Sequence, residues 1–488
     1  MKLSKLLERV KYIEVKGDTD TEISGLAYDS RKVTEGCIFV CIVGMKFDGH
    51  EAALEAVEKG AAALVVSKDI ELPGGVSVIK TEDTRLALAQ LSAAWFGYPA
   101  EKLTTIGITG TKGKTTTTYL VKSILEHVGR KVGLVGTIET IIGDERIPSV
   151  NTTPESYVLQ ESFAKMVEAG LDTVIMEASS QGFKLHRTEG FIFDIGIFTN
   201  LEPDHIGEGE HKDFQEYLSC KAKLFRQCRL GILNGDDSHM EEILKGHTCR
   251  VESYGLGEGC DLKAGDIRLV NKGKSLGVEF RVSGLMDMEA YIDMPGKFSV
   301  YNALCAIAIC RNLGADAQAV KEGLKRAKVK GRIENIEVSE DFSLMIDYAH
   351  NAMALESLLT TLKEYEPGRL VSLFGCGGNR SKLRRFEMGE VSGRLADLTV
   401  ITSDNPRFEE PLAIMDDIET GIKKTSGSYV KIADRKEAIK YVIQNGKKGD
   451  VIVLAGKGHE DYQEIKGEKH HMDERELIAQ VLEELKNA

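Results

Sequence analysis

Apolar and polar positions in the middle of the chain predict strands and helices in turn. A β-branched run at 104–109 is followed by a helical pattern at 115–128, which Gly129 ends. Further short apolar runs, typical of buried central strands, lie at 132–135, 173–176 and 195–198. This alternation is typical of a parallel sheet that is covered by helices.

The same alternation returns toward the C-terminus and is less regular near the N-terminus. The C-terminal apolar runs, each before a Gly- or Asp-rich turn, lie at 344–346, 370–374, 398–402 and 451–454. Near the N-terminus, a helical stretch at 51–59 ends at Gly60 and precedes a buried run at 61–66. We therefore predict an α/β protein whose three domains span 1–102, 103–331 and 332–488, with ligands at the carboxyl ends of the strands.

Composition narrows the class of protein. The chain has 488 residues, of which 42% are apolar, and a net charge of −13, so we expect folded domains and no broad nucleic-acid surface. Its nine cysteines include no Cys-x-x-Cys pair, which favours reduced thiols in a cytoplasmic protein over a zinc site or a disulfide framework. We expect no membrane insertion, because no signal peptide and no apolar run near the ~18 residues of a membrane span is visible.

A glycine-rich loop follows the predicted strand at 104–109 and precedes a helix. It reads Gly110-Thr111-Lys112-Gly113-Lys114-Thr115-Thr116. Glycines let backbone N–H groups turn toward phosphates, and the helix N-terminus adds partial positive charge. Lys114 can then reach the outer phosphates of a nucleotide, and the Thr115 hydroxyl can bind Mg²⁺. The strict phosphate-loop pattern has glycine where Ile108 stands, so this loop is a variant, and a ligand-free turn is the structural alternative.

Two side chains at neighbouring strand ends are candidates for a metal site. Glu177 ends the strand at 173–176, and His205 follows the strand at 195–198 at the same predicted edge of the sheet. Each residue alone is more often structural, as an exposed acid or a hydrogen-bonding histidine. Beside a phosphate loop, the two together favour Mg²⁺ ligation.

The order of short motifs along nearly the whole chain resembles that of the Mur ligases of peptidoglycan synthesis. The motifs are Asp29-Ser30-Arg31, the loop 110–115, Asn151-Thr152-Thr153-Pro154, Glu177-Ala178-Ser179-Ser180, Asp204-His205, 221–225, Tyr301-Asn302-Ala303, Gly331-Arg332, Asp347-Tyr348-Ala349-His350 and Gly456-Lys457-Gly458-His459-Glu460. No single motif is specific, but the combination in this order is.

The resemblance implies a fold and a reaction. It implies an N-terminal UDP-binding α/β domain, a central P-loop ATPase and a C-terminal Rossmann-like domain that binds an amino acid. It also implies a monomeric, cytoplasmic ligase with Mg²⁺ as cofactor and with ATP and UDP-MurNAc-L-Ala-D-Glu as substrates. The γ-phosphate of ATP would activate the D-glutamate γ-carboxylate, and the amine of a third amino acid would attack the acyl phosphate. Such an enzyme would serve cell-wall biogenesis, cell shape and cell division.

Matching positions carry the family's roles to single residues. Besides the loop, the ATP-binding positions are Asn302, Arg332 and Asp347. Ser30 resembles the residue at the UDP end, and those at the muramoyl-dipeptide are Asn151, Thr152, Thr153, Ser179 and Arg187. The implied Mg²⁺ ligands are Thr115, Glu177, His205 and a carbamate on Lys221 (N6-carboxylysine). By its residues alone Lys221 is an ordinary solvated lysine, and Lys223 is the neighbouring alternative on another helix face.

Asp404-Asn405-Pro406-Arg407 resembles the motif of family members that add meso-diaminopimelate. Diaminopimelate differs from lysine by a distal carboxylate, which an arginine fork can bind through two parallel hydrogen bonds. With lysine, Arg407 would meet no anion, at a cost on the order of 2–5 kcal/mol. Arg385, Gly456 and Glu460 resemble further contacts, with Glu460 taking the distal ammonium. A plain turn with an exposed arginine is the structural alternative.

The chain departs from the family pattern in three places. His350-Asn351-Ala352-Met353 replaces the usual His-Thr-Pro-Asp, Gln181 replaces a histidine, and the segment 378–386 differs from its common form. The functional alternatives are a lysine-adding synthetase, a folylpolyglutamate-type ligase, and a nucleotide-binding regulator without turnover.

Overall fold

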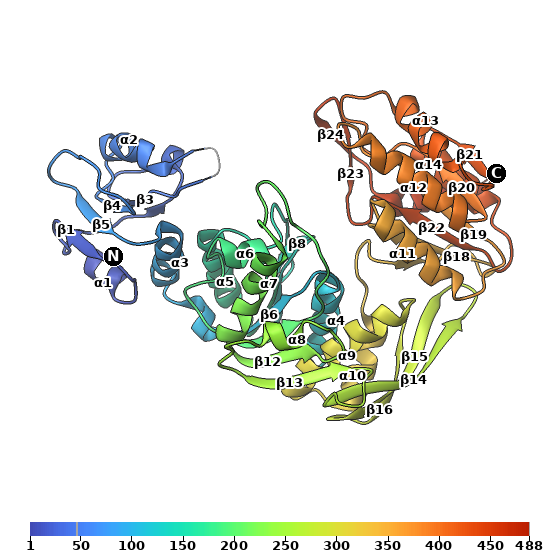
Figure 1. Cartoon of the computed structure of the whole chain (residues 1–488), viewed down its shortest axis with the longest axis horizontal. Coiled ribbons are helices and arrows are strands. Elements are labelled where there is room, and N and C mark those ends of the chain that lie inside the picture. Colours follow the sequence, from blue (N-terminus) through green and yellow to red (C-terminus); the bar gives the residue numbers. More distant parts are fainter. Residues whose placement is uncertain (45–46, 488) are drawn as a thin grey trace. The chain divides into compact units, whose positions relative to one another are not determined.

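The computed structural model describes residues 1–44 and 47–487, which form two compact units (Figure 1). The first unit comprises Met1–Leu262 and Cys305–Ala319, and the second comprises Lys263–Leu304 and the chain from Val320 onward. Strands and helices alternate in both units, which confirms the predicted α/β class. Among the described residues, no helix is long and apolar enough to cross a membrane.

A five-stranded sheet forms the N-terminal part of the first unit, in the order β1-β5-β4-β3-β2. Its strands are β1 (Glu14–Lys16), β2 (Leu26–Ala27), β3 (Ile38–Val40), β4 (Ala63–Val66) and β5 (Ser77–Lys80), and only β1 is antiparallel to its neighbour. Val65 and Leu64 enter different hydrophobic cores on the two faces, so β4 is continuously apolar. The helices are α1 (Leu3–Leu7), α2 (Ala53–Glu58) and α3 (Thr84–Trp95).

A larger sheet follows in the first unit, in the order β13-β12-β11-β6-β10-β7-β8-β9. The strands are β6 (Thr104–Thr109), β7 (Val132–Val135), β8 (Glu139–Ile142), β9 (Glu145–Pro148), β10 (Thr173–Glu177), β11 (Phe193–Phe198), β12 (Cys228–Asn234) and β13 (Arg250–Gly255). All neighbours from β13 to β7 are parallel, and the four predicted strands are confirmed. Because β6 lies between β10 and β11, the segments that follow these three strands meet at one edge.

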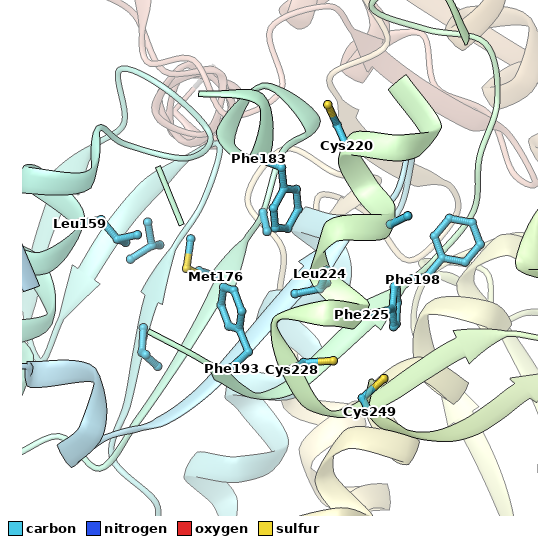
Figure 2. Close-up of a cluster of buried hydrophobic side chains, with 14 of the residues drawn as sticks. Leu159, Met176, Phe183, Phe193, Phe198, Cys220, Leu224, Phe225, Cys228 and Cys249 are labelled. Atoms are coloured by element: carbon cyan, nitrogen blue, oxygen red, sulfur yellow. The ribbon is translucent and has the colours of Figure 1, made fainter. Parts of the chain in front are cut away.

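An aromatic core fixes the helices that carry the site residues of this unit (Figure 2). Phe183, Phe193 and Phe225 are at most 2% exposed, and burying each such side chain contributes ~1.5–3 kcal/mol. They come from α6, from β11 and from the turn at Lys223–Arg226. The helices of this part are α4 (Lys114–His127), α5 (Ser156–Glu168), α6 (Ser180–Lys184), α7 (Phe214–Ala222) and α8 (Met240–Ile243).

The second unit begins with the strands β14 (Leu262–Asn271), β15 (Leu276–Gly284) and β16 (Met288–Ile292), of which β15 and β16 pair antiparallel. A six-stranded sheet follows in the order β17-β18-β22-β19-β20-β21, with β17 alone antiparallel. Its strands are β17 (Glu334–Ile336), β18 (Ser343–Asp347), β19 (Leu370–Phe374), β20 (Leu398–Ile401), β21 (Tyr429–Lys431) and β22 (Val451–Ala455). The four strands predicted here are therefore confirmed.

Helices cover both faces of the six-stranded sheet, and each face has its own hydrophobic core. They are α11 (Ala352–Lys363), α12 (Lys382–Leu395), α13 (Pro411–Ile422), α14 (Arg435–Gln444) and α15 (Glu474–Lys486). The segments α9 (Lys297–Asn312) and α10 (Ala317–Arg326) precede this sheet in the chain. A hairpin of β23 (Tyr462–Ile465) and β24 (Glu468–His471) follows β22 (Figure 1).

Candidate functional site

The glycine-rich loop connects the end of β6 to the N-terminus of α4, as predicted. Gly110 has φ +144°, and a Cβ there would lie 1.9 Å from Thr199 Oγ1, so a side chain is excluded. The Thr111 N–H donates to the carbonyl of Asn200 (2.9 Å), and the Lys112 N–H donates to its side-chain Oδ1 (2.9 Å). Lys114 donates from Nζ to two carbonyls of the loop itself. The segment after β11 thus holds the loop in shape.

Glu177 lies at the carboxyl end of β10, beside β6, and is 1% exposed. Its Oε1 accepts hydrogen bonds from the Thr115 hydroxyl (2.9 Å) and the Thr137 N–H (2.9 Å). Its Oε2 accepts from the Thr137 hydroxyl (2.9 Å). The structure therefore brings the predicted acid into contact with the hydroxyl of the loop, and a carboxylate next to a hydroxyl is an oxygen pair that suits Mg²⁺.

Lys221 lies on α7 and is 2% exposed, which differs from a solvated lysine. Its Nζ donates to the carbonyl of Gly110 (2.8 Å) and lies 4.5 Å from the ring centroid of Tyr217. Burial, with the charge of Lys114 as a second cause, lowers the pKa of Lys221 well below its usual value. Lys223 instead donates to the carbonyl of Phe183 (3.1 Å). Of the two lysines, Lys221 is the one that contacts the phosphate loop.

His205 lies on an exposed turn, with φ +54°. Its Nδ1 is 3.2 Å from Glu210 Oε1, and its ring centroid is 6.2 Å from that of Tyr217, whose hydroxyl is 3.0 Å from Thr111 Oγ1. Within residues 1–44 and 47–487, no three His, Cys, Asp or Glu side chains form a metal-binding group. The predicted Mg²⁺ ligands include only two such side chains, Glu177 and His205. The other two are the Thr115 hydroxyl and a carbamate on Lys221.

The residues predicted to hold the muramoyl-dipeptide gather around Glu177. Thr153 Oγ1 is 2.9 Å from the Glu177 carbonyl and accepts a hydrogen bond from the Ser179 N–H (2.9 Å). Thr152 Oγ1 is 3.1 Å from Thr137 Oγ1, which links it to the same acid. Arg187 donates to the carbonyl of Thr153 (3.0 Å) and pairs with Glu155.

Two other predicted substrate positions are less engaged. Asn151 is exposed at the start of the turn that precedes α5. Ser30 lies in a 3₁₀ turn of the N-terminal sheet, which Asp29 caps, and its carbonyl accepts from Lys59 Nζ (3.0 Å). Ser30 thus belongs to the part of the chain that forms the five-stranded sheet, and its contact with a substrate stays a prediction.

Arg332 and Asp347 lie together in the second unit. The Asp347 carboxylate accepts from the N–H groups of Ile333 (2.9 Å) and Ala349 (2.8 Å). Burial raises the pKa of Asp347, and the neighbouring Arg332 opposes this shift. The Arg332 guanidinium also lies 5.0 Å from the ring centroid of Tyr348. Asn302, the predicted adenine contact, is 7% exposed on α9.

The 350–353 departure has a structural explanation. Asn351 Oδ1 accepts from the Ala354 N–H (2.9 Å) and caps α11. The loop therefore keeps a capped helix start without the usual threonine.

The Asp404–Arg407 motif forms a hydrogen-bonded group with the hairpin. Arg407 Nε donates to Glu464 Oε2 (2.9 Å), and its Nη1 donates to the carbonyl of Gly378 (2.8 Å). Asn405 Nδ2 donates to Glu460 Oε2 (3.0 Å). Pro406 precedes the left-handed Arg407 (φ +53°).

Gly456 closes this group on the side of β22. It has φ +106°, and a Cβ there would lie 3.2 Å from Asp404 Oδ2. The structure thus brings the ends of β20 and β22 together at the predicted amino-acid site.

Arg385 differs from Arg407 because its guanidinium is almost completely buried and contacts two acids. It is 1% exposed, and it donates to Asp417 on α13 (2.9 Å) and to Glu409 (2.8 Å). Arg385 therefore ties α12 to the segment after Arg407, and its contact with a substrate stays a prediction.

Several residues of the site carry no local sequence signal. The sequence predicted no role for Thr137, Asn200, Glu464 or Lys457, although Lys457 lies within one of the motifs, because these roles depend on which strands are neighbours. It also predicted none for His211, which is fully buried, lies with Nε2 2.9 Å from Ser180 Oγ, and donates from its backbone to the carbonyl of His205 (3.0 Å).

Comparison with known proteins identifies the family. Three family models match consecutive segments: "Mur ligase family, catalytic domain" at 22–96, "Mur ligase middle domain" at 108–310 and "Mur ligase, glutamate ligase domain" at 331–458. The UDP-N-acetylmuramoyl-L-alanyl-D-glutamate--2,6-diaminopimelate ligase of Caldanaerobacter subterraneus subsp. tengcongensis is 45% identical over 99% of both chains. The chain belongs to the Mur ligase family. The predicted resemblance is thereby confirmed over the length of this Mur ligase.

Further relatives agree with this assignment. Ligase 1 of the same description from Clostridium acetobutylicum is 45% identical and covers 99% of this chain and 100% of its own. A solved structure of a UDP-N-acetylmuramoyl-L-alanyl-D-glutamate--2,6-diaminopimelate ligase covers 100% of both chains with 27% identity and a TM-score of 0.76. Folylpolyglutamate synthase of Mycobacterium tuberculosis, at 17% identity, covers 76% of this chain and 92% of its own with a TM-score of 0.58, which shows a shared fold alone.

Proposed function

We propose that this Mur ligase uses ATP to add meso-diaminopimelate to UDP-MurNAc-L-Ala-D-Glu. Its relatives at 45% identity over nearly the whole chain carry this reaction in their names. The structural observation that carries the proposal is the contact of Thr115 with Glu177, which joins a phosphate loop to a buried acid. The enzyme would work as a cytoplasmic monomer in peptidoglycan precursor synthesis, on small-molecule substrates.

The reaction needs an activated carboxylate, because a free carboxylate is a poor electrophile. The D-glutamate γ-carboxylate attacks the γ-phosphorus of ATP, the bond to ADP breaks, and an acyl phosphate forms. The amine of the third amino acid then attacks the acyl carbon, phosphate leaves, and the nitrogen loses a proton. The loop N–H groups and the Lys114 ammonium stabilise the charge that develops on the phosphoryl oxygens.

The proposed Mg²⁺ ligands are Thr115, Glu177, His205 and a carbamate on Lys221. The donor chemistry of Thr115, Glu177 and a carbamate fits the ion, since oxygen atoms are the ligands that Mg²⁺ prefers, and His205 would supply the one nitrogen. When bound, Mg²⁺ offsets the negative charge of the phosphates and the substrate carboxylate. An uncharged amine is the form that adds to CO₂, and the burial that lowers the pKa of Lys221 favours this form.

The other predicted residues supply the remaining subsites of the proposal. Ser30 would contact the UDP end, and the muramoyl-dipeptide would lie against Asn151, Thr152, Thr153, Ser179 and Arg187. The ATP site would be completed by Asn302, Arg332 and Asp347. Of the proposed domains, 1–102 would supply the UDP contact, 103–331 the dipeptide contacts with the phosphate loop and Asn302, and 332–488 would supply Arg332 and Asp347.

Arg407 supports diaminopimelate as the third amino acid. Its Nη2 edge faces no partner among the hydrogen bonds of the described residues, so a carboxylate can bind there. However, Glu464 already pairs with Arg407, so lysine would not leave this charge unpaired. The free-energy cost of binding lysine that the sequence suggested is therefore too large. The ion pair favours a second candidate function, in which the enzyme also adds lysine, but more slowly.

Phosphate release tests the proposed reaction. The purified protein is supplied with ATP, Mg²⁺, UDP-MurNAc-L-Ala-D-Glu and meso-diaminopimelate, and each component is left out in turn. We expect phosphate and the nucleotide-tripeptide only in the complete mixture. ATP binding without ligation, also with L-lysine or L-glutamate as acceptor, would show a regulator in place of a ligase.

A further inference from the structure

Lys457 lies directly after β22 and is completely buried, with a side chain that is 0% exposed. Its ammonium donates to Asn405 Oδ1 (3.0 Å), to Glu460 Oε2 (2.8 Å) and to the carbonyl of Tyr462. An ammonium has three N–H donors, so all of them are used inside the protein. Any effect of Lys457 on a substrate must therefore act through these neighbours.

The first neighbour, Asn405, has its amide orientation fixed by Lys457. Its Oδ1 receives two donors that can only donate, the Lys457 ammonium and the Glu464 N–H (2.9 Å). Its Nδ2 therefore points to Glu460 Oε2, 3.0 Å away. A flipped amide would set donor against donor, so one orientation is stable.

The second neighbour, Glu460, is held through one oxygen. Its Oε2 accepts from both Lys457 and Asn405, and its side chain is 17% exposed. No hydrogen bond or ion pair among the described residues uses Oε1. That oxygen is the one that remains for a substrate ammonium.

The same group extends to Arg407 through Glu464. Glu464 accepts from Arg407 Nε (2.9 Å) with its carboxylate, while its N–H binds Asn405. The distal ammonium and carboxylate of diaminopimelate are attached to one carbon, so their spacing is set by covalent geometry. The protein must hold Glu460 and Arg407 at a matching spacing, and the hydrogen-bonded group centred on Asn405 does this.

We infer that Lys457 is a positioning residue of the amino-acid site, which sets Asn405 and Glu460 for the distal carbon of a diamino acid. Two charged contacts and the carbon chain define three points around that carbon, so they also distinguish its two configurations. Lys457 thereby contributes to selection of the meso isomer over the L,L isomer. This inference rests on the proposed function.

The test compares Lys457→Met with the unchanged enzyme. Methionine keeps the length of the apolar stem and removes the three donors. We expect the KM for meso-diaminopimelate to rise at least ~10-fold, the KM for ATP to stay within ~2-fold, and the meso to L,L ratio of kcat/KM to fall at least ~3-fold. Lys440→Met is the matched control, because it removes a lysine that pairs with Glu484 on α15 in the same domain (2.9 Å, side chain 29% exposed).

Three further measurements make the result decisive. In a double variant with Glu460→Gln, the two effects on KM should be strongly non-additive, because Lys457 acts through Glu460. The melting temperature shows whether Lys457→Met folds. If it does not, Lys457→Arg gives the same test, because the planar guanidinium of arginine cannot reproduce the three tetrahedral donors of the ammonium. Equal changes in the KM values for meso-diaminopimelate and ATP, or an unchanged meso to L,L ratio of kcat/KM, would overturn the inference. If the unchanged enzyme itself releases no phosphate with diaminopimelate, the proposed function has failed instead.

Discussion

Arg407→Ala should weaken the binding of diaminopimelate selectively. The substitution removes a guanidinium that Glu464 and the Gly378 carbonyl hold in place, with the side chain 21% exposed. A hydrogen bond to a charged group contributes ~1.5–3 kcal/mol, and each ~1.4 kcal/mol is a factor of ten. The KM for meso-diaminopimelate should therefore rise roughly 10- to 150-fold.

The assay is phosphate release with one substrate varied at a time. The KM for ATP should stay within ~2-fold, because the phosphate contacts belong to Gly110–Thr116. The kcat/KM for L-lysine should change by less than ~3-fold, because lysine has no distal carboxylate. Arg394→Ala is the matched control, since it removes an exposed ion pair with Glu356 that is worth only ~0–1 kcal/mol. An equal rise in the KM values for ATP and diaminopimelate would refute the role of Arg407.

Three other predictions concern the phosphate loop, a glycine contact and the half-buried His459. Lys221→Ala should lower kcat at least ~100-fold in the phosphate-release assay, because it removes the amine at the Gly110 carbonyl and the proposed carbamate. Gly331→Ala should lower the free energy of unfolding in urea by ~2–4 kcal/mol, because φ is +67° and a Cβ would lie 2.1 Å from the Gly458 and His459 backbone. Burial, with Arg332, Lys330 and Arg475 nearby and Asp461 opposing, lowers the pKa of His459 to about 4. As pH falls from about 6.5 to 4, His459 therefore takes up a proton in the unfolded chain before it does so in the folded protein. The free energy of unfolding should fall by up to ~3 kcal/mol over that window, and His459→Asn should remove this loss.

Each of these has a control and a contrary outcome. Lys223→Ala should keep kcat, and full activity of Lys221→Ala would contradict the carbamate. Gly314 has φ +90° with open space around it, so Gly314→Ala measures the cost of backbone strain alone. If Gly331→Ala loses no more free energy of unfolding than Gly314→Ala, the protein relieves the clash expected at position 331. The same pH dependence in the enzyme and in His459→Asn would show that other groups cause it.

Sequence alone predicted the parts of the site that follow strand ends. Gly110 to Thr116 could be placed because glycines and Gly-Lys-Thr stand between a β-branched run and a helix, and Glu177 because its strand runs parallel to that one. These are local patterns combined with one rule about sheet edges.

The remaining residues could not be predicted, because tertiary neighbours determine their roles. Thr137 follows β7, and only the pairing of β7 with β10 brings it to Glu177. Arg385 is buried by Glu409 and Asp417, which lie 24 and 32 residues further along the chain. Glu464 pairs with Arg407 across 57 residues, and this pair changed the expected discrimination against lysine.

The ratio of kcat/KM for meso-diaminopimelate to that for L-lysine tests the central claim most directly. It is measured with the unchanged enzyme at saturating ATP, Mg²⁺ and UDP-MurNAc-L-Ala-D-Glu, with the tripeptide product identified by mass. A distal carboxylate on Arg407 predicts a ratio above ~10. A ratio of one or less would contradict the claim and identify a lysine-adding enzyme.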